Sequence, residues 1–309
     1  MKKNYNIGVD LGGTNISLGI LNDNFEIIYK DSVKTEKNAY GIDILKQIYN
    51  LYKKSIKTKK INEANINKIG IGIPGKCDNI KGIVEYTTNI NLTNTNVRLE
   101  MSKFTNIPVY IENDANCAAF AESYKENLKN MIMITLGTGI GGGVVLNGNK
   151  IGGNIEMGHH IIDTTGPMCG CGNYGCFESH CSATALIKSA KEIAEESKTK
   201  ILDFCEGDIE KIEAKFIFDA AEQGDEISKK LIDDYIYYLS IGINNLINCY
   251  PIDTVVIGGG ISSRGEKLLL PLKEKLKKLA LGGILKTNIK IATLGNDAGI
   301  IGAAMLDAI

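Results

Sequence analysis

The stretch Val9-Asp10-Leu11-Gly12-Gly13-Thr14 decides the fold, because it ends an apolar strand in a tight glycine turn. Residues 15–21 alternate in polarity and predict a second strand directly after the turn. Successive backbone N–H groups in such a turn can bind an anion, and glycine lets a phosphate approach the backbone. The carboxylate of Asp10 suits a Mg²⁺ ion that keeps most of its waters. An ordinary hairpin turn is the alternative, whereas a P-loop or a dinucleotide fingerprint would need a helix where this strand follows.

The same strand and turn return 125 residues later, where Leu136 takes the place of Leu11. In Ile134-Thr135-Leu136-Gly137-Thr138-Gly139 and the residues that follow it, five of the eight residues 136–143 are glycine. A flexible hairpin is the alternative, but such a run costs conformational entropy without adding packing. The pattern therefore favours a second turn that contacts phosphate, and its recurrence indicates a duplicated fold.

A third glycine run, Gly258-Gly259-Gly260, follows a buried strand and precedes a helix. Sheets of α/β proteins bind nucleotides at this position, although a plain strand–helix connection has the same pattern. Glycine accounts for 34 of the 309 residues, and 13 of these lie in residues 137–175. Because proline occurs only five times, the excess is not that of collagen or of a Pro/Gly-rich linker.

Strand and helix patterns alternate along the chain, which predicts an α/β fold with mixed sheets. The length suggests two domains, and no linker separates them, so we expect close packing around a central cleft. The expected domains are residues 1–114, with a closing helix at 297–309 that packs back on them, and residues 115–296. Buried strands are expected at residues 69–73, 107–111, 254–257 and 289–292. Helices are expected at residues 42–52, 114–125, 182–197, 225–249, 262–281 and 299–308.

Charge and composition exclude several classes of protein. Lys and Arg total 35 against 36 Asp and Glu, and 33 of the 35 are lysine, since Arg98 and Arg264 are the only arginines. A nucleic-acid partner is not expected, because guanidinium groups make most bidentate contacts to phosphate and guanine. No apolar stretch reaches the roughly 18 residues of a membrane span, and Asp10 interrupts the apolar run behind the basic start, which argues against a signal peptide. We expect a cytoplasmic protein.

The segment Glu112-Asn113-Asp114 lies between a predicted strand and a predicted helix. Asp114 is a common residue type at a helix N-cap, and taken alone this structural role is the simpler interpretation. The functional interpretation makes Asp114 a general base that faces the cleft.

One histidine and three cysteines form the most specific pattern in the chain. His159, Cys169, Cys171 and Cys176 match the Cys₃His donor set of a structural tetrahedral zinc site, and three glycines let the loop curl around an ion. A disulfide is the alternative, but a cytoplasmic setting and the spacing of Cys169 and Cys171 argue against it. We do not expect His160 or His180 to bind metal. The remaining cysteines are expected to fill the core: Cys77, Cys117, Cys181, Cys205 and Cys249.

Taken together, these motifs resemble those of the ROK family (repressors, open reading frames and sugar kinases), which has the duplicated actin/Hsp70/sugar-kinase fold. The resemblance covers nearly the whole chain, and the cysteine-rich segment is its most specific part. The matching segments are Asp10-Leu11-Gly12-Gly13-Thr14 and Gly137-Thr138-Gly139 for the phosphate motifs, Glu112-Asn113-Asp114 for the catalytic aspartate, Glu156-Met157-Gly158-His159 and residues 169–178 for zinc and sugar, residues 255–260 for adenosine and residues 295–304 for the closing helix.

The resemblance implies an ATP-dependent hexose kinase, in which Asp114 would accept the proton of a sugar hydroxyl as it attacks the γ-phosphorus of ATP. Asp10 would position Mg²⁺, and a structural Zn²⁺ would order the sugar loop, with His159 serving both zinc and sugar. The sugar contacts implied are Gly75, Asn89, Asn113, Asp114, Glu156, His159 and Glu178. The nucleotide and its metal would contact Asp10, Gly12, Gly13, Thr14, Asn15, Gly137, Thr138, Gly139, Gly258, Gly259 and Gly260.

Within the family the pattern is closest to glucose kinases that phosphorylate the 6-hydroxyl, but kinases of N-acetylmannosamine, N-acetylglucosamine and fructose share every motif. The segment Asn89-Ile90-Asn91-Leu92 departs from the Asn-Leu-Pro pattern common in glucose kinases, and the chain has no tryptophan. Repressors of the family carry a helix-turn-helix domain before the first phosphate motif, whereas Asp10 comes almost at once, so we expect an enzyme. A non-catalytic sugar sensor is not favoured, because Asp10 and Asp114 are both present. Relatives are commonly dimers or tetramers, which implies a homo-oligomer.

Overall fold

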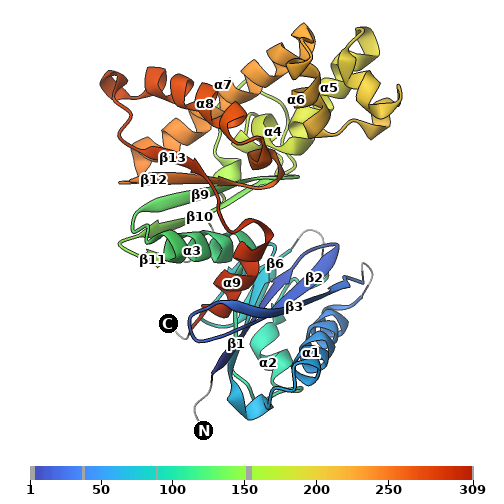
Figure 1. Ribbon diagram of the computed structural model, residues 1–309, viewed down its shortest axis with the longest axis vertical. Coiled ribbons are helices and arrows are strands. Elements are labelled where there is room, and N and C mark those ends of the chain that lie inside the picture. The colour runs from blue at the N-terminus through green and yellow to red at the C-terminus, as the bar shows by residue number, and fades with distance from the viewer. Residues whose placement is uncertain (1–3, 37–38, 88–89, 151–154, 308–309) are drawn as a thin grey trace. The chain divides into compact units, whose positions relative to one another are not determined.

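The structure is a computed structural model that describes residues 4–36, 39–87, 90–150 and 155–307 (Figure 1). The α/β class predicted from the sequence is confirmed, with mixed sheets and helices. Two compact units make up the chain: Met1–Lys129, Gly143–Ile155 and Thr293–Ile309 form the first, and Asn130–Gly142 and Glu156–Ala292 form the second. Asn89, one of the predicted sugar contacts, lies outside the described residues.

A five-stranded sheet forms the centre of the first unit. Its order is β3 (Ile27–Lys34), β2 (Asn15–Leu21), β1 (Tyr5–Leu11), β4 (Ile66–Ile73) and β8 (Val109–Asn113). β1 pairs antiparallel with β2 and parallel with β4, and the first glycine turn joins β1 to β2. The two strands predicted on either side of the first glycine turn are therefore present, and so are the buried strands predicted near residues 69–73 and 107–111.

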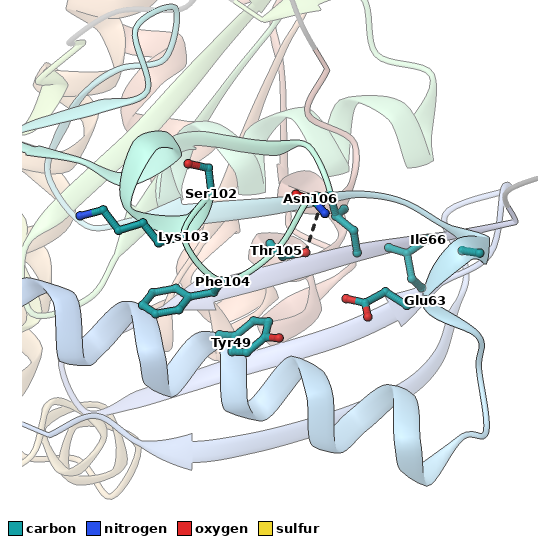
Figure 2. Close-up of a pocket in the computed structure, with 10 residues that line it drawn as sticks. Tyr49, Glu63, Ile66, Ser102, Lys103, Phe104, Thr105 and Asn106 are labelled. Carbon is teal, nitrogen blue, oxygen red and sulfur yellow. Dashed lines mark hydrogen bonds between the residues drawn. The ribbon is translucent and has the colours of Figure 1, made fainter.

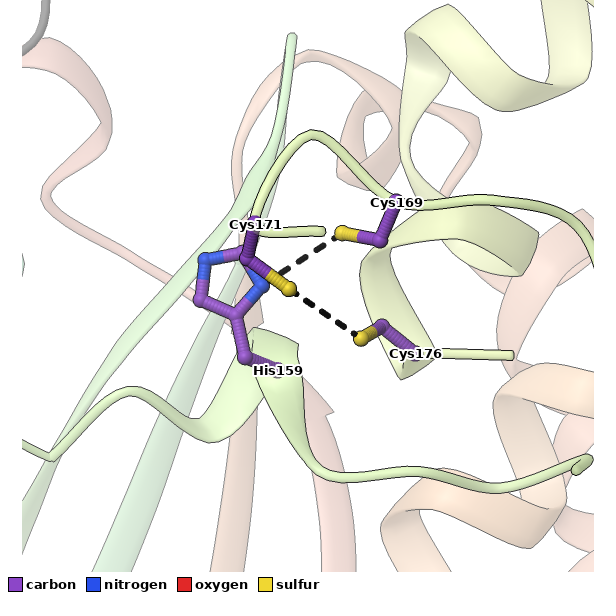
Figure 3. A group of neighbouring side chains, drawn as sticks. All are labelled: His159, Cys169, Cys171 and Cys176. Carbon is purple, nitrogen blue, oxygen red and sulfur yellow. Dashed lines mark hydrogen bonds between the residues drawn. The ribbon is translucent and has the colours of Figure 1, made fainter. Parts of the chain in front are cut away.

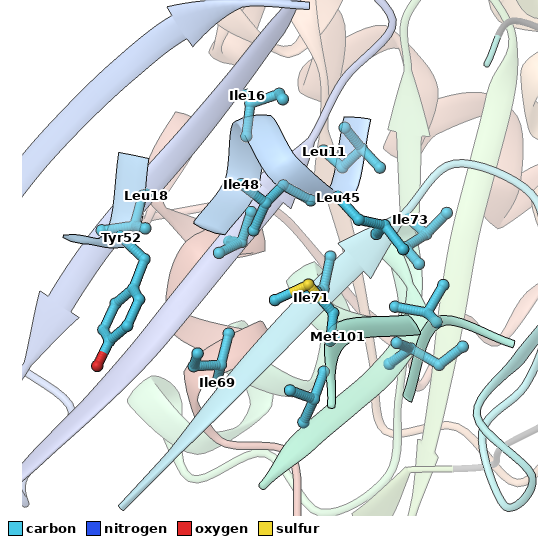
Figure 4. Packing of buried hydrophobic residues seen from close by; sticks show 14 of the residues in the cluster. Leu11, Ile16, Leu18, Leu45, Ile48, Tyr52, Ile69, Ile71, Ile73 and Met101 are labelled. Atoms are coloured by element: carbon cyan, nitrogen blue, oxygen red, sulfur yellow. The ribbon is translucent and has the colours of Figure 1, made fainter. Parts of the chain in front are cut away.

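Successive side chains of a strand point to opposite faces of a sheet, so both faces of this sheet have apolar side chains to bury. One helix covers each face. On one face, α1 (Gly41–Thr58) packs Leu45 and Ile48 into a core of strand side chains that includes Leu18 (Figure 4). On the other face, the backbone of α9 (Ala298–Ala304) packs directly against the strands. A Cβ at Gly8 would overlap the carbonyl oxygen of Ile300, so this position of β1 requires glycine.

α3 (Asp114–Glu126) begins where β8 ends, and α9 packs along it. A Cβ at Gly302 would overlap the carbonyl oxygen of Cys117, so the two helix backbones touch. The buried Glu122 carboxylate accepts hydrogen bonds from the backbone N–H of Thr293 at 2.8 Å and of Leu294 at 2.7 Å, which fixes the segment that leads into α9. α9 ends at Ala304 and is therefore shorter than the closing helix predicted at residues 299–308.

A small antiparallel sheet, which the sequence patterns do not predict, lies between β4 and β8 in the chain. Its strands are β5 (Lys76–Asp78), β6 (Ile83–Tyr86) and β7 (Thr95–Asn96), and α2 (Val97–Met101) follows them. Gly75 leads into it with φ +131°, a conformation that favours glycine, and a Cβ there would overlap the carbonyl oxygen of Tyr86.

The second five-stranded sheet has the order β11 (Asn149–Lys150), β10 (Ile140–Leu146), β9 (Met131–Leu136), β12 (Thr254–Gly258) and β13 (Asn288–Ile291). β12 pairs parallel with both β9 and β13, whereas β10 and β11 form an antiparallel hairpin. A glycine turn again separates one strand from the next, between β9 and β10. The predicted repeat of the strand–turn–strand device is therefore present in the fold.

The helices of the second unit are α4 (Phe177–Cys181), α5 (Ala183–Glu196), α6 (Ala214–Glu222), α7 (Glu226–Cys249) and α8 (Glu266–Leu279). The sequence predicts α5 and α7 closely and misses α6. The helix predicted at residues 262–281 is wrong at its start, because a 3₁₀ turn, Gly260–Arg264, comes first and Gly265 takes φ +56° before α8 begins. Other 3₁₀ turns lie at Glu63–Asn65, Met157–His159, Lys200–Cys205, Ile209–Lys211, Leu281–Gly283 and Gly295–Asp297.

One of the five cysteines predicted to fill the core does not do so. Cys249 is exposed, because it is the last residue of α7 and the buried residues of that helix end at Leu246. Cys77, Cys117, Cys181 and Cys205 are buried, as predicted. Throughout the part of the chain that the structure describes, no helix combines the length and apolar character needed to cross a membrane.

Candidate functional site

The first glycine turn is held by backbone hydrogen bonds at its base. Gly12 N–H donates to the carbonyl of Asn15 at 2.9 Å, and the Thr35 hydroxyl donates to the carbonyl of Gly12 at 2.7 Å. Leu11 and Ile16 on either side are fully buried, while Thr14 and Asn15 are exposed. The buried flanks thus anchor a turn whose tip faces solvent, which is the arrangement that an anion-binding turn needs.

Asp10 is half-buried at the end of β1, just before this turn. Burial and, to a smaller extent, the negative charge of Asp114 together raise the pKa of its carboxyl to about 6. Gly299 of α9 leaves room for the carboxyl group, since a Cβ there would lie 2.9 Å from Asp10 Cγ. The carboxylates of Asp10 and Asp114 repel one another beside the first glycine turn. Such a pair fits a hard cation such as Mg²⁺, which prefers oxygen ligands and would relieve the repulsion.

Asp114 is the first residue of α3, and it is not the N-cap of that helix. The capping residue is Asn113, whose side-chain oxygen accepts a hydrogen bond from Asn116 N–H at 3.0 Å. Asp114 Oδ1 accepts from the N–H of Ala115 at 2.8 Å. The structural interpretation of Asp114 is therefore wrong, because its neighbour already caps the helix.

Glu112 connects this segment to the loop that carries Gly75. Its side chain is only 1% exposed and accepts hydrogen bonds from Asn79 Nδ2 at 2.8 Å, Asn113 N–H at 3.0 Å and Asn116 Nδ2 at 3.2 Å. Asn113 Nδ2 also donates to the carbonyl of Gly75 at 3.0 Å. The predicted sugar contacts Gly75 and Asn113 are thus hydrogen-bonded to each other. The role of Glu112 is missing from the sequence-based site, although a carboxylate at a buried strand position is a signal that could have revealed it.

The second glycine turn is joined to Glu178 within the second unit. Glu178 Oε2 accepts a hydrogen bond from Ile140 N–H at 2.8 Å, and a Cβ at Gly139 would overlap the same carboxylate. The carbonyl of Thr138 accepts a hydrogen bond from the Thr184 hydroxyl at 2.7 Å, so α5 also holds the turn. A residue predicted to contact the sugar and a turn predicted to contact phosphate therefore touch through a single hydrogen bond.

A cavity of about 370 Å³ joins the second and third glycine runs. Gly137, Thr138 and Gly260 lie on its wall, whereas Gly258 is buried in β12 and Gly259 packs against Leu136. Ligand pockets are typically about 300–1,000 Å³ and mostly apolar with a few polar groups, and this cavity meets that description. Most of its wall was not predicted, because it comes from α6 and from the 3₁₀ turn after β12. The lining residues are Leu136, Gly137, Thr138, Ala183, Ile187, Glu213, Ala214, Lys215, Phe218, Gly260, Ile261, Ser263 and Arg264.

The predicted zinc ligands converge on one point. One donor atom each from His159, Cys169, Cys171 and Cys176 lies within 4.8 Å of the others (Figure 3). His159 Nδ1 is 3.5 Å from Cys169 Sγ, and Cys171 Sγ is 3.6 Å from Cys176 Sγ. Zinc bonds of about 2.3 Å to sulfur and 2.0 Å to nitrogen give tetrahedral edges of about 3.5–3.8 Å, so the donor set fits tetrahedral Zn²⁺. The sulfurs are too far apart for a disulfide, and the thiols are free.

The other histidines lie outside this cluster, as predicted. His160 Nδ1 is 2.5 Å from the carbonyl of Met157, and the ring of His180 stacks on Tyr238 at 4.0 Å. His159 turns Nδ1 toward the cysteines, which leaves Nε2 as the ring nitrogen for a second partner. Glu156 is exposed at the start of the same 3₁₀ turn, and its carbonyl accepts the N–H of His159 at 3.0 Å.

A larger cavity of about 570 Å³ lies in the first unit and is lined by none of the predicted site residues (Figure 2). Tyr49 and Phe104 stack on one wall with ring centroids 5.6 Å apart, and the half-buried Glu63 and the exposed Asn106 lie on others. Glu63 already bonds to Lys53 at 2.8 Å. The predicted residues that the structure describes lie elsewhere, at the three glycine runs, at the start of α3 and around the cysteine cluster.

Comparison with known proteins agrees with the motifs. Residues 6–308 match the ROK family. A glucokinase of Halalkalibacterium halodurans is 36% identical over 317 aligned residues, which cover 99% of this chain and 96% of that protein. A glucokinase of Thermotoga maritima is 35% identical, with 97% and 96% covered. The crystal structure of a ROK family glucokinase from Streptomyces griseus with glucose and AMPPNP superposes with a TM-score of 0.82 at 28% identity, covering 97% of this chain and 98% of that one.

Proposed function

The chain belongs to the ROK family, and on this premise we propose that it is an ATP-dependent glucokinase that transfers the γ-phosphate of ATP to the 6-hydroxyl of glucose. Full-length similarity to glucokinases supports the reaction and the sugar. The solved relative holds glucose together with an ATP analogue, which supports both substrates. The fold of that relative is matched over nearly the whole chain.

The observation that carries the mechanism is the position of Asp114. It begins α3 without being needed as the helix cap, and it lies close enough to Asp10 to raise the pKa of that carboxyl. We assign Asp114 as the general base that accepts the proton of the attacking hydroxyl. Asn113 and Gly75, joined by a 3.0 Å hydrogen bond, would orient the sugar beside it, and Asn89 stays a proposed further contact.

Phosphoryl transfer depends mainly on positioning and on stabilising charge, and backbone N–H groups can supply much of both. The proposed phosphate contacts are the exposed turn at Gly12, Gly13, Thr14 and Asn15 and the turn at Gly137, Thr138 and Gly139. Asp10 would hold Mg²⁺, which when bound neutralises phosphate charge. The cavity at Gly260 has the volume and apolar wall for the nucleoside, and Gly258 and Gly259, which precede Gly260 in the same run, stay proposed nucleotide contacts.

The cysteine cluster orders the sugar loop in this proposal. Zn²⁺ held by His159, Cys169, Cys171 and Cys176 would fix the segment from Glu156 to Glu178, which carries three proposed sugar contacts. The thiols need a reducing compartment to stay free, so we propose that the protein works in the cytoplasm. We also propose a homodimer or homotetramer, which size-exclusion chromatography with light scattering will test.

An ADP-release assay tests the proposal directly. ATP and Mg²⁺ are supplied with glucose, N-acetylmannosamine, N-acetylglucosamine or fructose, and kcat/KM is compared across the four sugars. We expect glucose to have the highest value and Asp114→Asn to remove turnover with every sugar. A higher value for an N-acetyl sugar would replace glucose as the substrate, and absence of ADP release with all four would overturn the kinase assignment.

A further inference from the structure

Each of the two arginines in this lysine-rich chain uses its side chain to join separate segments of the chain. A guanidinium group is planar and offers five N–H donors, so it can join several acceptors at once, whereas a lysine ammonium acts as a point charge on a flexible stem. The chain has 35 Lys and Arg, and only Arg98 and Arg264 are arginine. Each of these two side chains bonds to separate segments next to one part of the candidate site.

Arg264 joins the third glycine run to α6. It ends the 3₁₀ turn Gly260–Arg264, and its side chain is 18% exposed. Nη1 donates to Asp219 Oδ1 at 2.6 Å, Nη2 donates to the carbonyl of Lys215 at 3.3 Å, and the guanidinium carbon lies 5.4 Å from the ring centroid of Phe218. All three partners belong to α6.

These contacts fix the width of the 370 Å³ cavity. Lys215 and Phe218 line it from α6, and Gly260 and Arg264 line it from the glycine run. Because Arg264 bonds across this wall, it sets the distance between the helix and the run. Its ring contact also holds the face of Phe218 in one orientation.

Arg98 has the corresponding place in the first unit. From α2, Nη1 donates to the carbonyl of Ile80 at 2.9 Å, Nη2 to the carbonyl of Asn79 at 3.0 Å and Nε to the carbonyl of Val109 at 3.3 Å. Val109 is the first residue of β8, the strand that leads to Asp114. All three guanidinium nitrogens therefore tie the turn after β5 to the base of the catalytic strand.

The turn that Arg98 holds is bonded in its own right to the catalytic segment. Asn79 Nδ2 donates to the buried Glu112 at 2.8 Å, and Glu112 accepts from Asn113 N–H at 3.0 Å. Asn113 in turn donates to Gly75 at 3.0 Å. A shift of Asn79 would therefore reach the proposed sugar contacts through two hydrogen bonds.

We propose that Arg98 and Arg264 are positioning residues, Arg98 for the proposed sugar contacts Gly75 and Asn113, and Arg264 for the proposed nucleotide pocket. Neither needs to touch a substrate, since each acts through the segments that it joins. The inference rests on the proposed kinase function, because it assigns one substrate to each arginine.

The test compares Arg98→Lys with Arg264→Lys in the full-length protein. Both variants keep the positive charge and lose the fork of donors. Loss of a charge-assisted hydrogen bond corresponds to about a tenfold change or more. We expect Arg264→Lys to raise KM for ATP by about tenfold and leave KM for glucose within about twofold. Arg98→Lys is expected to raise KM for glucose by about tenfold and leave KM for ATP within about twofold.

Matched controls break exposed ion pairs on the same helices. Lys267→Ala removes the 2.5 Å pair with Glu222 of α6, and Lys103→Ala removes the 2.7 Å pair with Glu100 of α2. Both controls should leave the two KM values unchanged, because exposed pairs contribute little. Asp219→Asn, which weakens the same contact from the α6 side, should repeat the effect of Arg264→Lys and serves if that variant does not fold.

The outcomes separate this inference from the proposed function. If both arginine variants lower the melting temperature and leave both KM values unchanged, the two residues are structural only and the inference is wrong. Equal increases of both KM values in either variant would also overturn it. If the wild type releases no ADP with any sugar, the kinase assignment fails, and calorimetric titration of ATP into wild type and Arg264→Lys still tests the nucleotide arm. If Arg264→Lys binds ATP as tightly as wild type in this titration, the role assigned to Arg264 is wrong.

Discussion

Replacing Asp10 by asparagine should abolish activity and at the same time stabilise the protein at neutral and alkaline pH. Burial and the charge of Asp114 raise the pKa of Asp10 from 3.8 to about 6 in the folded protein. The folded state therefore binds this proton more tightly than the unfolded state. Above pH 6 the carboxyl is ionised in both states, and the folded state is penalised for holding the charge.

The size of the effect follows from the two pKa values. A difference of about 2 units corresponds to about 3 kcal/mol, because each unit is about 1.4 kcal/mol. At pH 8, Asp10→Asn should increase the free energy of unfolding by about 3 kcal/mol, since asparagine has nearly the same shape and no charge. At pH 5 folded Asp10 is mostly protonated while the unfolded carboxyl is mostly ionised, so the gain should fall to about 1.5 kcal/mol.

Urea denaturation of wild type and Asp10→Asn at pH 8 and pH 5, without Mg²⁺, measures these differences. Asp23→Asn is the matched control, because it removes one negative charge from an exposed turn and should change the free energy of unfolding by less than about 0.5 kcal/mol. Destabilisation of Asp10→Asn at pH 8, or a gain that does not depend on pH, would refute the reasoning. Addition of Mg²⁺ should stabilise wild type more than Asp10→Asn, since the ion would bind the carboxylate.

Three further predictions test other parts of the site. Asp114→Asn should lower kcat by roughly 10²–10⁴-fold, the usual contribution of a general base, while calorimetry still detects glucose binding; retained turnover would rule out the assignment. Cys176→Ser should remove zinc, measured by elemental analysis, and weaken glucose binding with it, whereas a zinc-free wild type would contradict the metal site. Gly139→Ala should raise KM for glucose by about tenfold, because the added Cβ displaces Glu178 and breaks its hydrogen bond to Ile140; an unchanged KM would show that Glu178 does not hold the sugar.

The cysteine cluster proposed to bind zinc shows how much a local pattern can predict. Four donor residues within 18 residues of chain, from His159 to Cys176, are enough to predict it, because short loops keep their ends close in any fold. The structure brings their donor atoms within 4.8 Å. In the same way, glycine next to an apolar strand end predicts both turns, because each turn joins two strands that are neighbours in the chain.

The sequence is a poorer guide where a contact depends on distant segments. Asp114 has the residue type and place of an N-cap, and only the hydrogen bond from Asn116 to Asn113 shows that its neighbour has that role. Glu112 is a charged residue inside a buried strand, and its partner Asn79 lies 33 residues away. The start of α8 was misplaced because Gly265 adopts a left-handed conformation that no periodicity reveals.

By itself, the sequence determined the fold class, the repeated glycine turns and the residue types of the proposed zinc ligands and proposed catalytic base, because each depends on residues close together in the chain. Only the tertiary structure decided which segments meet. The wall of the cavity proposed for the nucleoside comes from the second glycine turn, α5, α6 and the turn at Gly260, and Asp219 and Arg264 bond across 45 residues. Such pairings depend on how helices pack and on which buried polar groups find partners, and these are properties of the folded chain rather than of any local pattern.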